Sequence, residues 1–399
     1  MSEVFIGRQP ILDRDMHVFA YELKFNQGLN PNKHTLQATE ELIKQTEEDI
    51  GFQAIVGDHN AMLQLPKELI KKEALPYFEA GNQLVLEIPN NVTKDINVLR
   101  NLKELKADGT SIALHDFIDD EASIKLASIS DYVKIDIEAH SEMQMKKMLD
   151  SLHERGIKVI AEKVETEEMF FYLKKLGFDY FQGYFFTNPV VINGQKLSGN
   201  KLTLLQMFAK VNNPDTDFED LSSIISQDVG LSHKLLVVIN NPAAMIPIRV
   251  ESVVDALKYM GLKRLKFWVN MLLLSNMEDV PQELLTTSLM RAKFCELLAD
   301  ASGNSTDRDS FFLVGLFSNL GAFFKTPIDE IVAEMPLADE LKDALIDKKG
   351  PMGGALKVLV CIEQTNDTLD SLKFDGMGIG QISNSFMAAN AWAQKVITT

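Results

Sequence analysis

Short apolar runs alternate with amphipathic stretches through the first half of the chain. The runs are rich in Val, Ile and Leu, which favour strands, and the stretches have the 3.6-residue apolar period of helices. The expected strands are residues 4–6, 18–21, 84–88, 112–114, 132–135 and 159–161. The expected helices include residues 94–106 and 167–176, the latter between an N-cap at Thr166 and Gly177. Repeated strand–helix units predict parallel pairing and a (β/α) barrel.

The pattern changes after Pro189. The stretch from Gly194 to Asn200 has the composition of a linker. Beyond residue 200 nearly all apolar positions follow the helical period, for example in residues 253–260, 285–299 and 311–324. We therefore predict an α/β barrel domain over residues 1–195 and an all-α domain over residues 196–399.

Ionisable residues lie at the ends of several expected strands. Glu87, Asp116, Lys134 and Glu162 each fall at or just after the end of an apolar run. In a (β/α) barrel the carboxyl ends of the strands form the face that carries the site. A single charge at a strand end is as consistent with simple solvation, but four of them together indicate a site.

Composition supports a globular protein of two or three domains. The chain has 399 residues, of which 46% are hydrophobic and 24% charged. No apolar run approaches the roughly 20 residues of a membrane span, and residues 1–4 do not resemble a signal peptide. The only cysteines, Cys295 and Cys361, lie in helical patterns, so we expect a cytoplasmic protein without a disulfide framework.

The charge distribution argues against nucleic acid as a partner. The net charge is −17, with 21 Lys and Arg against 32 Asp and Glu in residues 1–195, and 19 against 25 in the rest. Nucleic-acid binding usually requires a basic patch that neutralises phosphates. Neither half of the chain has an excess of basic residues.

The first half resembles the EAL domain, the bacterial cyclic di-GMP phosphodiesterase family. The motifs that carry the resemblance occur in the family's order and span nearly all of residues 4–189. Each is weak alone, but the ordered set is specific. They are Gln9-Pro10-Ile11, Tyr21-Glu22-Leu23, Leu86-Glu87-Ile88, His115-Asp116-Phe117, Val133-Lys134-Ile135-Asp136, Ala161-Glu162-Lys163-Val164-Glu165-Thr166 and Gln182-Gly183-Tyr184.

The second half resembles the HDOD domain, a helical output module related to HD phosphohydrolases. The matching segments are residues 225–228, 240–242, 260–261 and 315–321. A shortened EAL unit followed by HDOD occurs in bacterial signalling proteins. The resemblance therefore covers the whole chain and implies a role in signal transduction.

The EAL resemblance implies a set of site residues. By that resemblance Glu22, Glu87 and Asp116 match metal ligands, Lys134 the lysine that assists the water, and Glu162 the catalytic glutamate. Metal-assisted phosphodiester hydrolysis needs such oxygen ligands, which suit Mg²⁺ or Mn²⁺. The retained positions are Glu22, Glu87, Asp116, Lys134, Glu162, Glu165 and Gln182.

Five substitutions depart from the family where chemistry would occur. His115 replaces an aspartate, Gln64 a metal-binding asparagine, and Asn90 a second glutamate. Ile118 replaces the glycine of the loop, which becomes bulky and acidic. Asn26 stands where the family usually has an arginine suited to bidentate phosphate binding. These losses weaken metal and substrate binding together.

The helical half lacks the ligands of an HD site. His233 is the only histidine in residues 196–399 and is expected on a helix surface. Ser318 and Asn319 occupy the segment where the His-Asp pair would lie. One histidine cannot supply the ligand set of that metal site.

Three functions remain open. The favoured one is a catalytically inactive EAL-HDOD signalling protein that needs no cofactor and binds another signalling protein through residues 196–399. The second is a residual cyclic di-GMP phosphodiesterase that uses Mg²⁺ or Mn²⁺ at Glu22, Glu87 and Asp116. The third is a receptor that binds cyclic di-GMP without hydrolysis.

Overall fold

A closed barrel of eight strands forms the first part of the chain. The computed structural model describes residues 4–27, 40, 43–44, 46–48, 51–64, 67–70, 84–90, 92, 96–188, 199–213, 215–227, 229–240, 250–275, 277, 280–364 and 372–398. The strands are β1 (Val4–Leu12), β2 (Val18–Gln27), β3 (Asn60–Gln64), β4 (Leu84–Pro89), β5 (Ser111–His115), β6 (Tyr132–Asp136), β7 (Lys158–Glu162) and β8 (Tyr180–Gln182). Strand β1 is antiparallel to β2 and β8, and the remaining neighbours are parallel. The predicted barrel is confirmed, with one reversed strand.

Helices on the outside of the barrel follow the parallel strands. They are α2 (Phe52–Val56), α3 (Ile96–Ala107), α4 (Glu121–Ala127), α5 (Glu142–His153) and α6 (Glu167–Leu176), with 3₁₀ turns at Lys67–Leu69 and Phe185–Thr187. The predicted cap is confirmed, because the Thr166 hydroxyl accepts a hydrogen bond from the Met169 amide. Gly177 ends the helix at φ 123°, a conformation that favours glycine.

The barrel interior has an apolar layer below a polar layer. The apolar layer contains Ile11, Ala20, Met62, Val85, Ala113 and Ile160, all fully buried. Because side chains on one face of a strand recur every second residue, the next inward positions lie one level higher. These positions are Gln9, Glu22, Gln64, Glu87, His115 and Glu162. The period of the strand therefore explains why the polar groups gather at one end of the barrel.

The described part of the chain beyond the barrel is mainly helical, as predicted. Its helices are α7 (Gly199–Asn212), α8 (Phe218–Gln227), α9 (Val229–Ile239), α10 (Val253–Ser275), α11 (Gln282–Ala301), α12 (Arg308–Phe317), α13 (Leu320–Phe324), α14 (Ile328–Ala333), α15 (Asp339–Asp347), α16 (Gly350–Gln364) and α17 (Ile379–Ile397), with a 3₁₀ turn at Ser305–Asp307. The boundary near residue 195 falls in residues 189–198, outside the described part, and stays a prediction. Within the described residues, no helix is long and apolar enough to cross a membrane.

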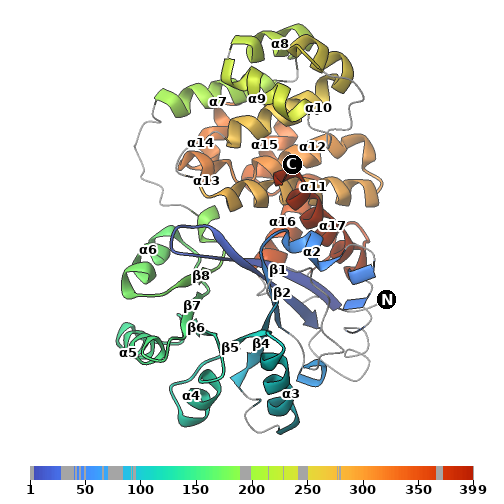
Figure 1. Ribbon diagram of the computed structural model, residues 1–399. Coiled ribbons are helices and arrows are strands. Elements are labelled where there is room, and N and C mark those ends of the chain that lie inside the picture. Colours follow the sequence, from blue (N-terminus) through green and yellow to red (C-terminus); the bar gives the residue numbers. More distant parts are fainter. Residues whose placement is uncertain are drawn as a thin grey trace.

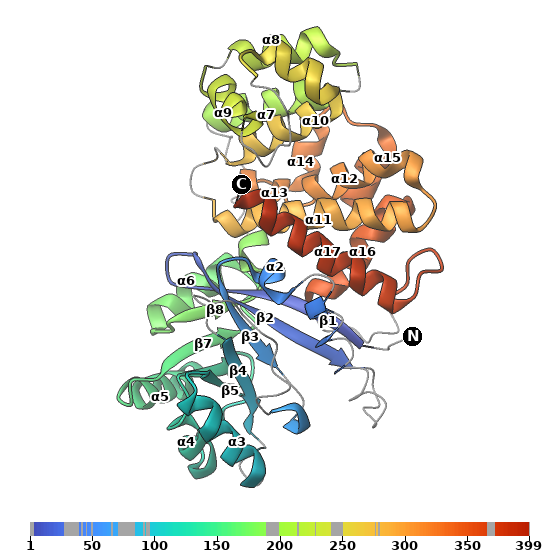
Figure 2. The same ribbon diagram turned by 45° about the vertical axis from the view of Figure 1, so that its right-hand side comes forward.

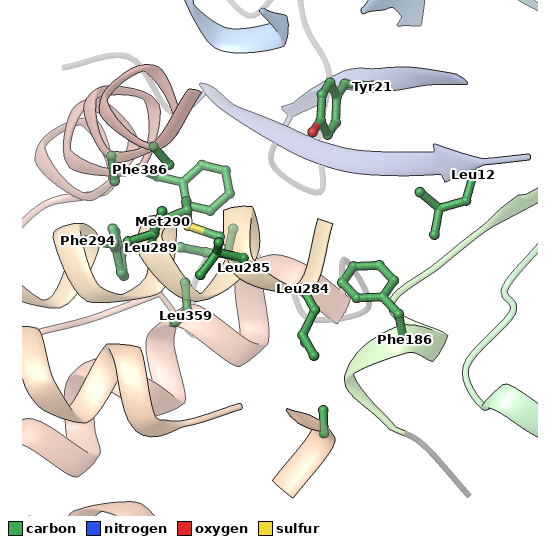
Figure 3. Packing of buried hydrophobic residues seen from close by; sticks show 14 of the residues in the cluster. Leu12, Tyr21, Phe186, Leu284, Leu285, Leu289, Met290, Phe294, Leu359 and Phe386 are labelled. Atoms are coloured by element: carbon green, nitrogen blue, oxygen red, sulfur yellow. The ribbon is translucent and has the colours of Figure 1, made fainter. Parts of the chain in front are cut away.

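The helical part packs against one side of the barrel. Helices α16 and α17 contact β1, and α17 also contacts α2, so the C-terminal helix lies against the N-terminal hairpin (Figures 1 and 2). Figure 3 shows Met290 of α11 and Phe386 of α17 near the hairpin that carries Leu12 and Tyr21. These side chains belong to one buried apolar cluster that extends through both parts.

Candidate functional site

The ammonium of Lys134 lies at the centre of the polar layer, among three carboxylates. Its Nζ is 2.8 Å from Glu22 Oε1, 3.0 Å from Glu87 Oε2 and 2.9 Å from Glu162 Oε1. Glu22 lies on β2, Glu87 on β4, Lys134 on β6 and Glu162 on β7. The side chains of Glu22, Glu87 and Lys134 are fully or almost fully buried. The structure therefore brings together four of the residues that the sequence placed at one site.

Burial and mutual attraction determine the charges of this cluster. Burial alone would lower the pKa of Lys134, but the surrounding carboxylates raise it well above its usual range. For Glu22 burial acts upward, and the nearby Lys134 and Lys24 ammonium groups lower its pKa. Burial and the neighbouring Glu22 carboxylate raise the pKa of Glu87. Lys134 is thus charged and Glu22 ionised, and Glu87 takes up a proton more readily than Glu22 does.

The second carboxylate oxygen of Glu22 is also occupied. It lies 3.1 Å from Lys24 Nζ and accepts a hydrogen bond from Gln182 Nε2. Gln182 donates to Gln9 Oε1 at 2.8 Å as well. Burial acts to lower the pKa of Lys24, and Glu22 raises it by more. Sequence reasoning missed Lys24, although its position two residues after Glu22 on one strand was the available signal.

His115 bonds to side chains on both sides. Its Nδ1 is 2.9 Å from Asp116 Oδ2, and its Nε2 is 3.2 Å from Gln64 Nε2. An imidazole that donates to the carboxylate and accepts from the amide is the neutral tautomer with its proton on Nδ1. The hydrogen bond from His115 lowers the pKa of Asp116, most of whose side chain faces solvent. Gln64, His115 and Asp116 therefore form a chain of hydrogen bonds that joins two substituted positions to the retained Asp116.

Three further predicted residues, Asn90, Ile118 and Glu165, lie outside this network. Asn90 Oδ1 accepts a hydrogen bond from Ser123 Oγ at 2.9 Å. Ile118 is 55% exposed, and Glu165 is also exposed. Asn26 lies in β2, but its side chain is outside the described part. Asn90, Ile118 and Glu165 do not join Lys134 and its carboxylates in the described structure.

The acidic loop after Ile118 has its own charge partners. Asp119 pairs with Lys147 at 2.7 Å, and Asp120 caps α4 by accepting from the Ser123 amide at 2.7 Å. Glu121 pairs with Lys125 at 2.6 Å. The loop is therefore less repulsive to an anion than its sequence alone indicates.

An arginine lies beside Ser318 and Asn319 in the helical part. Arg291 Nε donates to Glu363 Oε1 at 2.9 Å, and its Nη2 donates to Oε2 at 2.6 Å. Its Nη1 donates to Ser318 Oγ at 3.1 Å and to Asn319 Oδ1. The positive charge beside Ser318 and Asn319 is therefore that of Arg291, a residue of the protein itself. His233 is exposed on α9, as predicted.

In the described structure the oxygen donors of the barrel site are occupied by groups of the protein itself. Among the described residues there is no group of three or more His, Cys, Asp or Glu side chains arranged to hold a metal ion. The three barrel carboxylates converge on an ammonium group instead, and His115 presents no free ring nitrogen. Divalent Mg²⁺ and Mn²⁺ need several free oxygen donors around one point.

Comparisons with known proteins locate two families in the chain. The EAL domain family matches residues 34–189 and the HDOD domain family matches residues 201–334. The cyclic di-GMP phosphodiesterase CdgJ of Vibrio cholerae is 30% identical over 99% of this chain and 94% of its own length. The uncharacterized protein YuxH of Bacillus subtilis is 30% identical over 92% of this chain and 93% of its own length.

Solved structures with similar folds include two EAL proteins. A calcium and cyclic di-GMP complex of BlrP1 from Klebsiella pneumoniae is 18% identical, with a TM-score of 0.37 over 46% of this chain and 55% of that one. An EAL domain protein from Listeria monocytogenes is 20% identical, with a TM-score of 0.36 over 46% of this chain and 87% of that one. Together with the near full-length match to CdgJ, the two domain matches show that the chain belongs to the family in which an EAL domain is followed by an HDOD domain.

Proposed function

We propose that this chain is a signalling protein of the cyclic di-GMP-related EAL-HDOD type whose EAL domain does not hydrolyse the nucleotide. The observation that carries the proposal is the position of Lys134, whose ammonium binds Glu22, Glu87 and Glu162 at once. Hydrolysis by two metals requires those oxygens to bind cations of higher charge and to orient a water molecule. Releasing them from Lys134 would leave an ammonium buried without its partners, at a large cost.

The substituted positions support the same proposal. His115 and Gln64 replace oxygen ligands and are bonded to each other. Asn26 cannot provide the charge with which an arginine binds phosphate. In the helical domain Arg291 bonds to Ser318 and Asn319. We infer that neither domain assembles a hydrolytic metal site.

The alternative is a cyclic di-GMP phosphodiesterase, the activity that CdgJ is named for. Its support is that Glu22, Glu87, Lys134 and Glu162 remain together in one buried cluster. A receptor that binds cyclic di-GMP without cutting it is the third possibility. Its support is the acidic loop, whose charges are already paired.

A turnover assay combined with a calorimetric titration distinguishes the three functions. Purified full-length chain is incubated with cyclic di-GMP and Mg²⁺ or Mn²⁺, and linear product is measured by chromatography beside CdgJ as a positive control. We expect no product above background, and His115→Asp alone should not create activity. Linear product that disappears in Glu22→Ala would establish the phosphodiesterase. Calorimetric binding without turnover would establish the receptor.

A protein partner is the remaining part of the proposal. Without a hydrolytic metal site the HDOD domain catalyses no hydrolysis. Its helical surface then fits a role in binding another signalling protein. Its acidic composition favours a partner with a basic face, mainly by speeding association. Chemical cross-linking of the full-length chain in cell extract tests this. Cross-links confined to residues 1–195 would contradict output through the helical domain.

A further inference from the structure

A cavity of about 1000 Å³ lies within the helical domain. Helices α7, α10, α11, α12, α15, α16 and α17 all contribute to its lining. The volume is at the upper end of the range for small-molecule sites. No EAL motif residue lines this cavity, nor does Arg291, Ser318 or Asn319. It is therefore separate from the barrel site and from the location of an HD centre.

Three half-buried aromatic rings form one wall of the cavity. Phe267, Phe312 and Trp392 come from α10, α12 and α17, and their ring centroids lie 5.5 to 6.1 Å apart. None of the three rings is fully buried, so each has surface that a planar ligand can contact, and Lys293 Nζ lies over the Trp392 ring, 5.7 Å from its centroid. Stacking of a nucleobase on such faces contributes roughly 1–3 kcal/mol per base.

A lysine without a carboxylate partner lies in the same lining. Lys266 donates one hydrogen bond, to the Asn213 carbonyl at 3.1 Å, and within the described part of the chain no carboxylate pairs with it. Burial lowers the pKa of Lys266, as expected for an ammonium that lacks a counter-charge. By contrast, Lys293 and Arg308 share Glu296. Lys266 is thus a lining cation for which the described residues provide no carboxylate partner, although Asp307, Asp309 and Glu340 line the same cavity.

The floor of the cavity is polar and fixed. Asn212 and Asn270 are buried and donate to each other's amide oxygens at 2.8 and 2.9 Å. Asn212 uses both N–H groups, toward Asn270 and the Phe208 carbonyl, so the second N–H of Asn270 and the amide oxygens are the groups that suit the polar edge of a base. Aromatic faces, an amide floor and an ammonium that no described carboxylate pairs with are the complementary features of one ligand class.

We propose that this cavity binds a nucleotide, with the base against Phe267, Phe312 and Trp392 and the phosphate at Lys266. The site requires no metal ion and no chemistry at the barrel. Through this site the HDOD domain binds a small molecule independently of the barrel.

Intrinsic fluorescence allows a direct test on the full-length chain. The chain has two tryptophans, and Trp268 lines a different, mainly apolar hollow, so Trp268→Phe leaves Trp392 as the only fluorescent indole. GMP and AMP are titrated beside guanosine and adenosine, which lack the phosphate. We expect saturable quenching by at least one nucleotide, with the matching nucleoside binding at least tenfold more weakly.

Variants of the lining make the test specific. In the Trp268→Phe background, Lys266→Gln should weaken nucleotide binding at least tenfold, and Phe312→Leu should weaken both nucleotide and nucleoside. Lys258→Gln, an exposed lysine on the same helix, is the matched control and should bind as the parent does. Circular dichroism confirms that each variant is folded, and calorimetry repeats the titrations without relying on Trp392. Absence of saturable binding at millimolar nucleotide, or binding insensitive to Lys266→Gln and Phe312→Leu but lost in Glu22→Ala, would overturn the proposal.

Discussion

At the scale of single residues, Lys134 determines what the barrel site can do. Its side chain is fully buried and contacts three carboxylates within 3.0 Å. A buried ion cluster is not by itself strong evidence of stability, because desolvation offsets much of the attraction. Removing only one member is different, since the others stay buried without compensation. Removing Lys134 alone therefore lowers the stability of the protein by more than the net contribution of the whole cluster to that stability.

We expect Lys134→Met to destabilise the protein by about 3–5 kcal/mol, because Glu22 and Glu87 would lose their shared cation inside the barrel. Urea unfolding followed by circular dichroism measures the change. Lys125→Met is the matched control, because Lys125 pairs with Glu121 on the surface, and it should change little. Equal effects of the two substitutions would show that the Lys134 cluster is not an essential support of the barrel.

Glu283 is a second buried carboxyl, at the contact between the domains, and it makes stability depend on pH. Burial raises its pKa, although Arg8 and the hydrogen bond from Tyr21 act in the opposite direction. A carboxyl with a raised folded pKa contributes its stabilisation below the unfolded pKa of about 4.3 and loses it as pH rises through the folded pKa. The variant Glu283→Gln has no carboxyl at this position, so it does not lose this stabilisation as the pH rises.

We therefore expect the stability of Glu283→Gln, relative to wild type, to increase as the pH is raised from 4 to 7. Urea unfolding at several pH values measures the difference in free energy of unfolding. Glu168→Gln, an exposed carboxylate on α6, is the control for a general effect of charge removal. A difference that stays constant or narrows with rising pH would show that Glu283 does not titrate as the buried contact implies.

At the scale of the element, strand β2 faces two parts of the molecule. Glu22 points into the barrel toward Lys134, whereas the adjacent Tyr21 contacts the helical domain. The Tyr21 hydroxyl donates to Glu283 Oε2 at 2.6 Å and accepts from Gln394 Nε2 at 3.0 Å. Alternation along one strand thus places a site residue and an interdomain residue side by side.

Tyr21→Phe removes that hydroxyl and leaves the buried Glu283 and Gln394 without one partner each. We expect a loss of about 1–3 kcal/mol in the free energy of unfolding, the usual cost of an unsatisfied buried polar group. Tyr259→Phe, at an exposed position on α10, should have no measurable effect. If both variants unfold at the same urea concentration as the wild type, the contact contributes nothing to stability.

The sequence allowed the barrel and most of its strands to be predicted, because Val, Ile and Leu recur in buried strands between turns. Strand β3, with the sequence Asn-Ala-Met-Leu-Gln, was missed because it contains no β-branched or aromatic residue, and β8 was missed because it is only three residues long. Gln64 was named through the family motif, and the strand that carries it was not recognised. The hydrogen bond between Gln64 and His115 was not predictable either, because it joins positions 51 residues apart through barrel closure.

At the scale of the whole molecule, helix α17 joins the two domains. Asn390 and Gln394, one helical turn apart, bond to Arg8 and Tyr21 of the hairpin. Trp392 lies between them in sequence and lines the cavity of the helical domain. Arg8 is almost completely buried, and its guanidinium lies 3.5 Å from the centre of the Tyr21 ring. One helix thus contacts both the cavity and the strand that carries Glu22.

A double-mutant cycle tests whether this contact couples the domains energetically. Arg8 Nη1 donates to Asn390 Oδ1 at 2.6 Å, across 382 positions of sequence. Arg8→Ala and Asn390→Ala should each destabilise the chain, and together by less than the sum, with a coupling energy of about 0.5–3 kcal/mol. The control cycle pairs Arg8→Ala with Asn304→Ala, in the turn that follows α11, where the effects should add to within roughly 0.5 kcal/mol. Both cycles are measured by urea unfolding of the full-length chain. Strict additivity in the first cycle would mean that the two domains touch at Arg8 without stabilising each other there. Helix α17 would then not couple the cavity energetically to the barrel.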